Sequence, residues 1–216
     1  MMTSQNTILN LWDFDGTLFD TEPALYKVYS QALREVTGHI LTPEVWQSIF
    51  GKSAYALEEH YGISHETMVK VRDRKYELYP HTLYDGIFMI NHVRQFWDHP
   101  LALNYVCTHT NPDVAETILD KFEIRPWFKR VYGLKDVGHK AKPDPAMYLL
   151  AMGVGIIESH GIIKHINIFE DSDFGLGAAA NTKNAFDEEL YKAFPPETKL
   201  TIYKVTNEGI NEYEAP

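Results

Sequence analysis

The sequence predicts an α/β fold: a doubly wound, mainly parallel sheet with a small, all-helical cap domain. Three observations favour this fold. Short apolar runs alternate with segments of helical periodicity along most of the 216-residue chain, which is the pattern of strands and helices in a parallel sheet. A series of helical segments separates the first apolar run from the others, as an inserted domain would. Polar or acidic segments follow four of the runs, at the strand ends where open sheets bind ligands.

The first strand is expected in TILNLWDF (7–14), an apolar run that is too short for a typical helix and leads into Gly-Thr. From Glu22 to about His81 the apolar residues recur at helical spacing. Gly38 ends the first of these helices, and Thr42 begins the next as its N-cap, followed by a proline at the first helical position. We therefore expect a separate helical lobe after the first strand.

The rest of the chain is expected to complete the sheet, with helices between its strands. The expected elements are a helix over 88–97, a strand over 101–107, a helix begun by Pro112, a strand over 130–134, a helix begun by Asp144 and Pro145, a strand over 165–169, a small-residue helix over 175–181 and a strand over 200–205. The tail 207–216 is expected to be poorly structured. This pattern predicts a Rossmann-like core of 1–20 and 86–216 and a helical cap of 21–85.

Composition and charge exclude several classes of protein. The formal net charge of −10 disfavours nucleic-acid binding and requires that any anion site be built locally. No apolar run is long enough to cross a membrane, and the start MMTSQNTILNLWDF lacks the pattern of a signal peptide. The single cysteine, Cys107, can form no internal disulfide. We expect a cytoplasmic monomer with no nucleic-acid or membrane partner.

Two carboxylates, Asp13 and Asp15, leave the first expected strand in the segment DFDGTLFD (13–20). A carboxylate can attack a phosphoryl group and form an acyl phosphate if a metal cancels the charge repulsion. We assign Asp13 as this nucleophile, and Asp15 as the group that protonates the leaving oxygen and later activates water. Gly16 lets the backbone approach a ligand, so Gly16 and Thr17 are expected to contact substrate. The alternative is an ordinary strand end with an Asx turn.

Two later segments offer groups for a phosphate. The Thr108 hydroxyl, directly after LALNYVC, can bind a phosphoryl oxygen, and His109 is a candidate substrate contact. The alternative for the threonine is a cap or turn role. Lys142, in KAKPDPAMY (140–148), would neutralise the nucleophile and the transferred group as a point charge. Lys140 is its competitor, but the proline after Lys142 fixes the backbone there and favours Lys142.

An acidic cluster follows HINIF and begins with Glu170 and Asp171. Such a cluster in a buried cleft needs a cation, and Mg²⁺ prefers a few carboxylates together with water and substrate oxygens. Asp13, Asp171, the backbone carbonyl of Asp15 and Glu170 would supply that set. The residues after the acidic pair would cap the next helix. A surface acidic turn is the alternative interpretation.

In this order, the segments resemble those of the haloacid dehalogenase-like hydrolase superfamily, specifically its phosphatase and β-phosphoglucomutase-like branch with a helical cap inserted after the first motif. DFDGTLFDTEP, KPDPAMYLLA and FEDSDFGLGAAAN match the first, third and fourth motifs, and the resemblance covers about residues 7–185. It implies the roles already given to Asp13, Asp15, Thr108 and Lys142, and a magnesium motif in the acidic pair.

The resemblance also implies that Gly51-Lys52-Ser53 is the specificity loop of the cap, from which Lys52 could reach a substrate. The chain departs from the family pattern at two places. His109 stands where many relatives have asparagine, and the segment after Asn181 lacks the usual glycine-containing approach to the last strand.

The function implied is that of a magnesium-dependent phosphatase, which hydrolyses a small phosphorylated metabolite, a sugar phosphate or a nucleotide, through an aspartyl phosphate. Asp15 argues against dehalogenase chemistry, which needs no acid/base at this position. A phosphomutase of the β-phosphoglucomutase type shares the motifs and stays open. A catalytically silent binding or regulatory module is disfavoured, because the nucleophile, the lysine and the acidic motif are all present.

Overall fold

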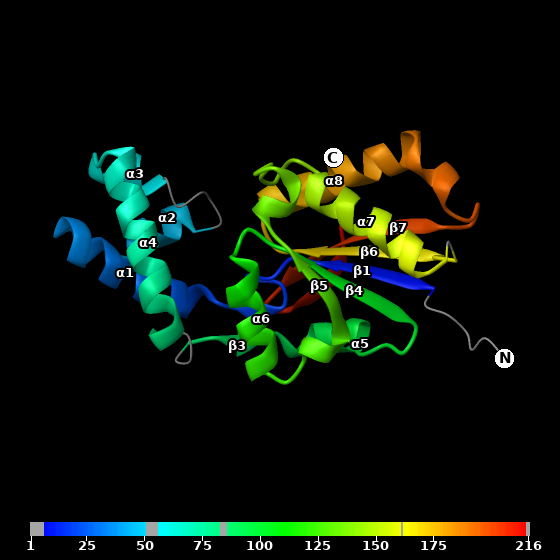
Figure 1. Cartoon of the computed structure of the whole chain (residues 1–216), viewed down its shortest axis with the longest axis horizontal. Coiled ribbons are helices and arrows are strands. Elements are labelled where there is room, and N and C mark those ends of the chain that lie inside the picture. The colour runs from blue at the N-terminus through cyan, green and yellow to red at the C-terminus, as the bar shows by residue number, and fades with distance from the viewer. Residues whose placement is uncertain (1–6, 51–55, 83–85, 161, 215–216) are drawn as a thin grey trace. The chain divides into compact units, whose positions relative to one another are not determined.

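The computed structural model describes residues 7–50, 56–82, 86–160 and 162–214, without the side chains of 80–82. The chain forms two compact units (Figure 1), one made of Met1–Phe19 and Met89–Pro216 and the other of Asp20–Phe88. The first is an α/β unit, and the second is built mainly from helices. In the described part of the chain, no helix is both long and apolar enough to span a membrane.

The α/β unit is built on a six-stranded sheet with the order β5-β4-β1-β6-β7-β8. The strands are β1 (Ile8–Trp12), β4 (Ala102–Cys107), β5 (Phe128–Tyr132), β6 (His165–Glu170), β7 (Lys199–Thr206) and β8 (Gly209–Glu212). All pairs are parallel except β7 with β8. The predicted doubly wound, mainly parallel sheet is confirmed.

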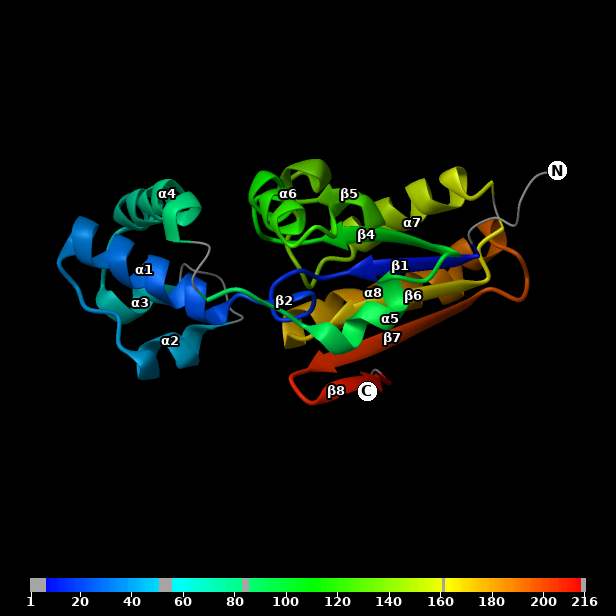
Figure 2. The ribbon, with the colours of Figure 1, turned by 90° about the horizontal axis from the view of Figure 1, so that it is seen from below.

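Helices cover both faces of this sheet, which explains why its central strands are mostly apolar. Figure 1 shows α7 and α8 on one face and α5 and α6 on the other, and Figure 2 shows α5 against the sheet from below. These helices are α5 (Arg94–Trp97), α6 (Pro112–Lys121), α7 (Ala146–Glu158) and α8 (Asp173–Glu188). The connections therefore place one helix pair on each side, as the alternating pattern of the sequence requires.

A row of asparagines crosses the three central strands at the same height. Asn10 of β1 is paired in register with Asn104 of β4 and with Asn167 of β6. The Asn167 side-chain amide donates to Asn10 Oδ1 at 2.9 Å, and the Asn10 amide donates to Asn104 Oδ1 at 3.0 Å. The indole N–H of Trp12 also donates to Asn104 Oδ1, at 3.0 Å. Buried polar groups that are satisfied in this way specify one arrangement of their neighbours.

The helical unit contains α1 (Glu22–Thr37), α2 (Pro43–Ile49), α3 (Ala56–Tyr61) and α4 (His65–Thr82), of which α1 packs along α4. The predicted helix ends are confirmed. Gly38 caps α1 in the left-handed conformation (φ 79°), which glycine adopts without strain. The Thr42 hydroxyl accepts a hydrogen bond from the backbone N–H of Val45 and so caps α2.

The predicted helix over 88–97 is wrong in its first half. Phe88–Met89 forms a short strand, β3, which pairs with β2 (Phe19–Asp20), and a 3₁₀ turn over Asn91–Val93 precedes α5. The apolar residues after Gly86 follow helical spacing, but backbone pairing with β2 takes Phe88 and Met89. Tertiary hydrogen bonding therefore overrides the local pattern here.

The prediction of a poorly structured tail is also wrong. Residues 209–212 form β8, which pairs with the outer side of β7, and the backbone N–H of Tyr213 donates to the carbonyl of Ile202 at 2.8 Å. The polar composition of the tail suits an edge strand that is half exposed to solvent.

Candidate active site

The carboxyl ends of three neighbouring strands carry the predicted site residues. The chain runs from β1 through β4 to β5 on one side of the sheet and then returns to β6 on the other side of β1. Such a reversal of strand order opens a crevice for a ligand. Asp13 follows β1, Thr108 follows β4, and Glu170 ends β6. The backbone N–H of Asp13 donates to the Phe169 carbonyl at 3.0 Å, which joins the first and last of these segments.

A buried lysine connects two carboxylates of the site. The Lys142 ammonium lies 2.5 Å from Asp13 Oδ1 and 2.5 Å from Glu170 Oε1. Lys142 is 8% exposed and Glu170 is fully buried, whereas Lys140 is exposed. Ion pairs in such surroundings are screened little by water. The structure therefore brings Lys142, and not Lys140, against the proposed nucleophile.

The other acidic residue of the cluster, Asp171, is held by the loop after β1. The Thr17 hydroxyl donates to Asp171 Oδ1 at 3.3 Å. Gly16 has a φ of 83°, and a Cβ on it would lie 2.2 Å from Asp171 Oδ2. Only glycine can therefore occupy position 16 without displacing this carboxylate. The contacts found for Gly16 and Thr17 are with Asp171, and their predicted contact with a substrate stays a prediction.

Two residues that the sequence did not point to complete the surroundings of Glu170. The Tyr148 hydroxyl, on the first turn of α7, donates to Glu170 Oε1. Gly175, in the first turn of α8, lies directly against the same carboxylate, since a Cβ there would be 1.8 Å from Glu170 Oε2. The N-cap of α8 is Ser172, whose hydroxyl accepts from the Gly175 N–H. The sequence offers no local signal for the contact of Tyr148, because it depends on how α7 packs against the sheet.

Burial dominates the electrostatics of the cluster. It raises the pKa of Asp13 to about 8 against the opposing charge of Lys142. Burial and then the charge of Asp13 raise the pKa of Asp171 to about 7. Burial alone would lower the pKa of Lys142, but the charges of Asp13 and Glu170 raise it above its ordinary value. Lys142 therefore stays charged, and one ammonium faces three carboxylates.

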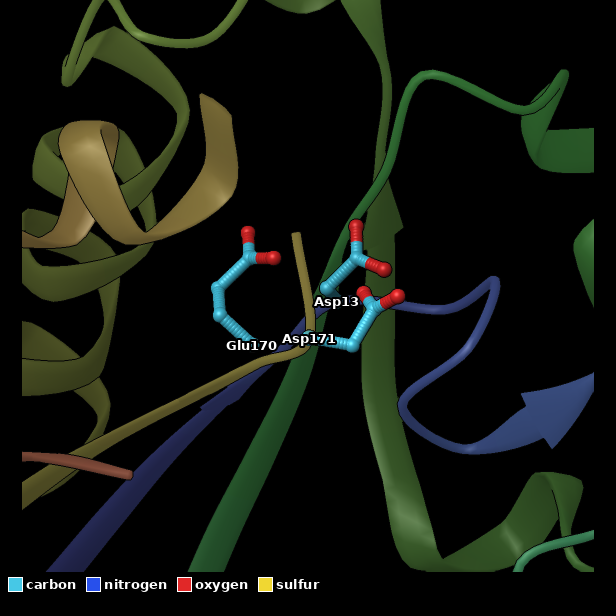
Figure 3. A group of neighbouring side chains, drawn as sticks. All are labelled: Asp13, Glu170 and Asp171. Atoms are coloured by element: carbon cyan, nitrogen blue, oxygen red, sulfur yellow. The ribbon is translucent and has the colours of Figure 1, made fainter. Parts of the chain in front are cut away.

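Three carboxyl groups that share one ammonium fit a divalent cation, which would favour their ionised form. Carboxylate oxygens of Asp13, Glu170 and Asp171 lie within 4.8 Å of one another (Figure 3). Glu170 Oε2 is buried, and among the described residues it has no hydrogen-bond partner, so one acceptor in this group is unsatisfied. An all-oxygen set of carboxylates suits Mg²⁺. The Asp15 carboxylate is not part of the group, and the predicted contribution of its backbone carbonyl stays a prediction.

The loop after β4 contacts two of the other site residues. The Thr110 hydroxyl donates to Asp15 Oδ2 at 2.6 Å, and the Thr110 N–H donates to Thr108 Oγ1 at 2.9 Å. The backbone N–H of Lys142 donates to His109 Nε2 at 2.9 Å. Partial burial and then the Lys142 charge lower the pKa of His109, which keeps the imidazole neutral and able to accept. In the structure, the His109 ring therefore contacts the backbone of Lys142. The substrate contact expected for His109 from the sequence stays a prediction.

The segment Gly51-Lys52-Ser53, which the resemblance assigns to substrate specificity, lies outside the described residues. The predicted contact of Lys52 with a substrate therefore stays a prediction. Every other site residue proposed from the sequence belongs to the α/β unit.

Known proteins resemble this chain in sequence. A model of the family described as haloacid dehalogenase-like hydrolase matches residues 10–186. The chain is 28% identical over 186 residues to the fructose-1-phosphate phosphatase YqaB of Escherichia coli, covering 78% of this chain and 89% of that protein. It is 29% identical over 162 residues to the pyrophosphatase PpaX of Listeria innocua, covering 71% of this chain and 70% of that protein.

A solved structure shares the fold. The HAD hydrolase of family IA, variant 3, from Entamoeba histolytica superimposes with a TM-score of 0.65 at 22% sequence identity, covering 81% of this chain and 80% of that chain. The family model spans most of the chain, including the segments that contain Asp13, Lys142 and Asp171. The protein therefore belongs to the haloacid dehalogenase-like hydrolase family.

Proposed function

We propose that the protein is a magnesium-dependent phosphatase that hydrolyses a small-molecule phosphomonoester through an aspartyl phosphate on Asp13. The observation that carries this proposal is the placement of Asp13 Oδ1 2.5 Å from the Lys142 ammonium, inside a group of three carboxylates that suits a divalent cation. A nucleophilic carboxylate needs this compensation to approach a phosphate. The names of the two sequence relatives, both phosphatases of small phosphorylated molecules, support the same activity.

In the first step, a carboxylate oxygen of Asp13 attacks phosphorus while the bond from phosphorus to the ester oxygen breaks. Asp15 gives its proton to that oxygen, so the leaving group departs as an alcohol. In the second step Asp15 takes a proton from water as the water oxygen attacks phosphorus. The bond to Asp13 then breaks, and inorganic phosphate leaves.

Lys142 and Thr108 act on the charge that these steps create. The Lys142 ammonium stabilises negative charge on the transferred group, and the buried Thr108 hydroxyl lies at the end of β4 on the same side of the sheet. Mg²⁺, held by Asp13, Asp171 and Glu170, would supply positive charge for the equatorial phosphoryl oxygens. Positioning and charge stabilisation account for most of the catalysis in phosphoryl transfer.

The substrate we propose is a small phosphorylated metabolite, either a sugar phosphate or a nucleotide. YqaB is named for a sugar phosphate and PpaX for pyrophosphate. The formal charge of −10 gives no long-range attraction for such anions, so recognition must come from groups close to the site.

The test is release of inorganic phosphate from a panel of sugar phosphates, nucleoside monophosphates and pyrophosphate, with and without Mg²⁺. We expect magnesium-dependent release that Asp13→Asn abolishes and that Asp120→Asn, an exposed change of the same type on α6, leaves intact. No release from any substrate by folded, magnesium-loaded protein would refute the proposal. Conversion of a sugar 1-phosphate to the 6-phosphate without release of phosphate would identify a mutase instead.

A further inference from the structure

The loop after β4 contains a threonine that the proposed mechanism does not use. The Thr110 hydroxyl donates a 2.6 Å hydrogen bond to Asp15 Oδ2 from a position 95 residues away in the sequence. The bond is part-buried, and its acceptor is the carboxylate that must deliver a proton. We propose that Thr110 is a positioning residue, which holds the Asp15 carboxylate in the orientation needed to protonate the leaving group. This inference rests on the proposed phosphatase function.

Thr110 is itself fixed to the sheet. Its backbone N–H donates to Thr108 Oγ1 at 2.9 Å, and Thr108 is fully buried. The backbone N–H of Thr108 donates in turn to the Tyr132 carbonyl of β5 at 3.0 Å. The hydroxyl that contacts Asp15 therefore projects from a short turn tied to two strands, and a donor of this kind loses little freedom when it binds.

The backbone of Asp15 is fixed independently. Asp15 forms a β-bridge with Phe19, and the next residue, Gly16, donates its N–H to the Phe19 carbonyl at 2.7 Å. With the main chain held, the remaining freedom of Asp15 is rotation of its side chain. The hydrogen bond from Thr110 to Oδ2 restricts that rotation and so fixes the direction in which the carboxyl group faces the leaving oxygen.

The same turn offers a contrasting residue. His109 accepts from the backbone of Lys142, whose ammonium acts on the transferred phosphoryl group and not on the leaving oxygen. Loss of the His109 contact should therefore slow transfer from every ester to a similar extent. Loss of the Thr110 contact should slow only those reactions in which the leaving oxygen needs a proton.

The experiment compares two esters, p-nitrophenyl phosphate and a simple alkyl phosphate, in wild type, Thr110→Val, Thr110→Ser and His109→Phe. Nitrophenolate departs without protonation, whereas an alkoxide does not. The quantity measured is kcat/KM, because it covers the steps up to phosphoryl transfer to Asp13 and excludes hydrolysis of the aspartyl phosphate. Thr117→Val on α6 is the matched control, since this exposed hydroxyl donates to the Asp113 carbonyl of its own helix.

For Thr110→Val we expect kcat/KM to fall about 10-fold to 100-fold with the alkyl ester and less than about 3-fold with the nitrophenyl ester, since general acid catalysis contributes about 100-fold or more. Thr110→Ser should recover most of the activity, and Thr117→Val should match wild type. His109→Phe should lower both values by a similar factor. Equal losses on the two esters in Thr110→Val, or no loss, would overturn the inference. Failure of the phosphatase proposal is distinguishable, because wild type would then release no phosphate from either ester.

Discussion

Replacing Gly175 by alanine should destabilise the protein, although it adds a better helix former. At an unconstrained helical position the change from glycine to alanine stabilises by about 1 kcal/mol. At Gly175 the new Cβ would lie 1.8 Å from Glu170 Oε2 and 2.0 Å from its Cδ. The carboxylate cannot move aside freely, because it is fully buried and holds both Lys142 and Tyr148.

Displacing the Glu170 carboxylate weakens two hydrogen bonds to a charged group, each of which contributes about 1.5–3 kcal/mol. After the gain in helix propensity, we expect Gly175→Ala to lower the free energy of unfolding by about 2–5 kcal/mol, or Tm by roughly 5–15 °C for a chain of this size. Phosphatase activity should fall as well, because Lys142 loses one of its two carboxylate partners.

Thermal and urea unfolding of wild type and variant would measure the effect. Gly153→Ala is the control, since this exposed position on α7 has nothing within 4 Å of a new Cβ and should gain up to about 1 kcal/mol. Shortening the obstructing side chain in a Glu170→Asp background should make Gly175→Ala less damaging, because the two sites are coupled. Wild-type stability in Gly175→Ala, with Gly153→Ala equally neutral, would refute the reasoning.

Three further predictions concern the metal, a helix cap and the cysteine. Burial raises the pKa of Asp13 to about 8 and that of Asp171 to about 7. The metal-free folded protein therefore keeps protons that the unfolded chain releases near pH 4. Its free energy of unfolding should fall as the pH rises from about 4 to 8. Magnesium favours the ionised carboxylates, so it should raise Tm more at pH 8 than at pH 6; equal shifts would contradict this. Ser172→Ala removes the N-cap of α8 and should cost about 1 kcal/mol in urea unfolding, whereas an unchanged midpoint would argue against the cap. Cys107 is fully buried and burial raises its pKa, so a thiol reagent should label it only in denaturant, and rapid labelling of native protein would disprove this.

The sequence predicts that the carboxyl groups of Asp13, Glu170 and Asp171 gather in one place, because these residues stand at a change in the local pattern. Asp13 and Glu170 stand where apolar runs end, and parallel strands bring such ends to one edge of the sheet. Chain order and periodicity therefore suffice to place them together. The same reasoning could not place Lys142, because it lies in a loop with Lys140, and only the proline after Lys142 favoured it.

The contacts of Tyr148, Thr110 and Gly175 depend on side chains meeting across elements, so no periodicity encodes them. The sequence does show a second hydroxyl, that of Thr110, two residues after Thr108. Its spacing does not link it with Asp15. The prediction for the tail was wrong for a different reason. Its polar residues indicated disorder, but Asn207-Glu208 connects β7 to β8 as a two-residue turn, with Thr206 paired to Gly209, and this pairing with β7 orders the tail.

The asparagine row fixes how far along its strand each carboxylate of the site lies. From Asn10 to Asp13 is three residues, and from Asn167 to Glu170 is again three, which corresponds to about 10 Å of strand in each case. The row aligns β1 with β6, and each strand then continues for the same length before its carboxylate residue. A slip of one strand by two residues would move one carboxylate past the other by about 6.6 Å, more than the 4.8 Å that contains the whole acidic group. The hydrogen-bonded amides of the central strands thus limit how far the carboxylates at the edge of the sheet can shift relative to one another.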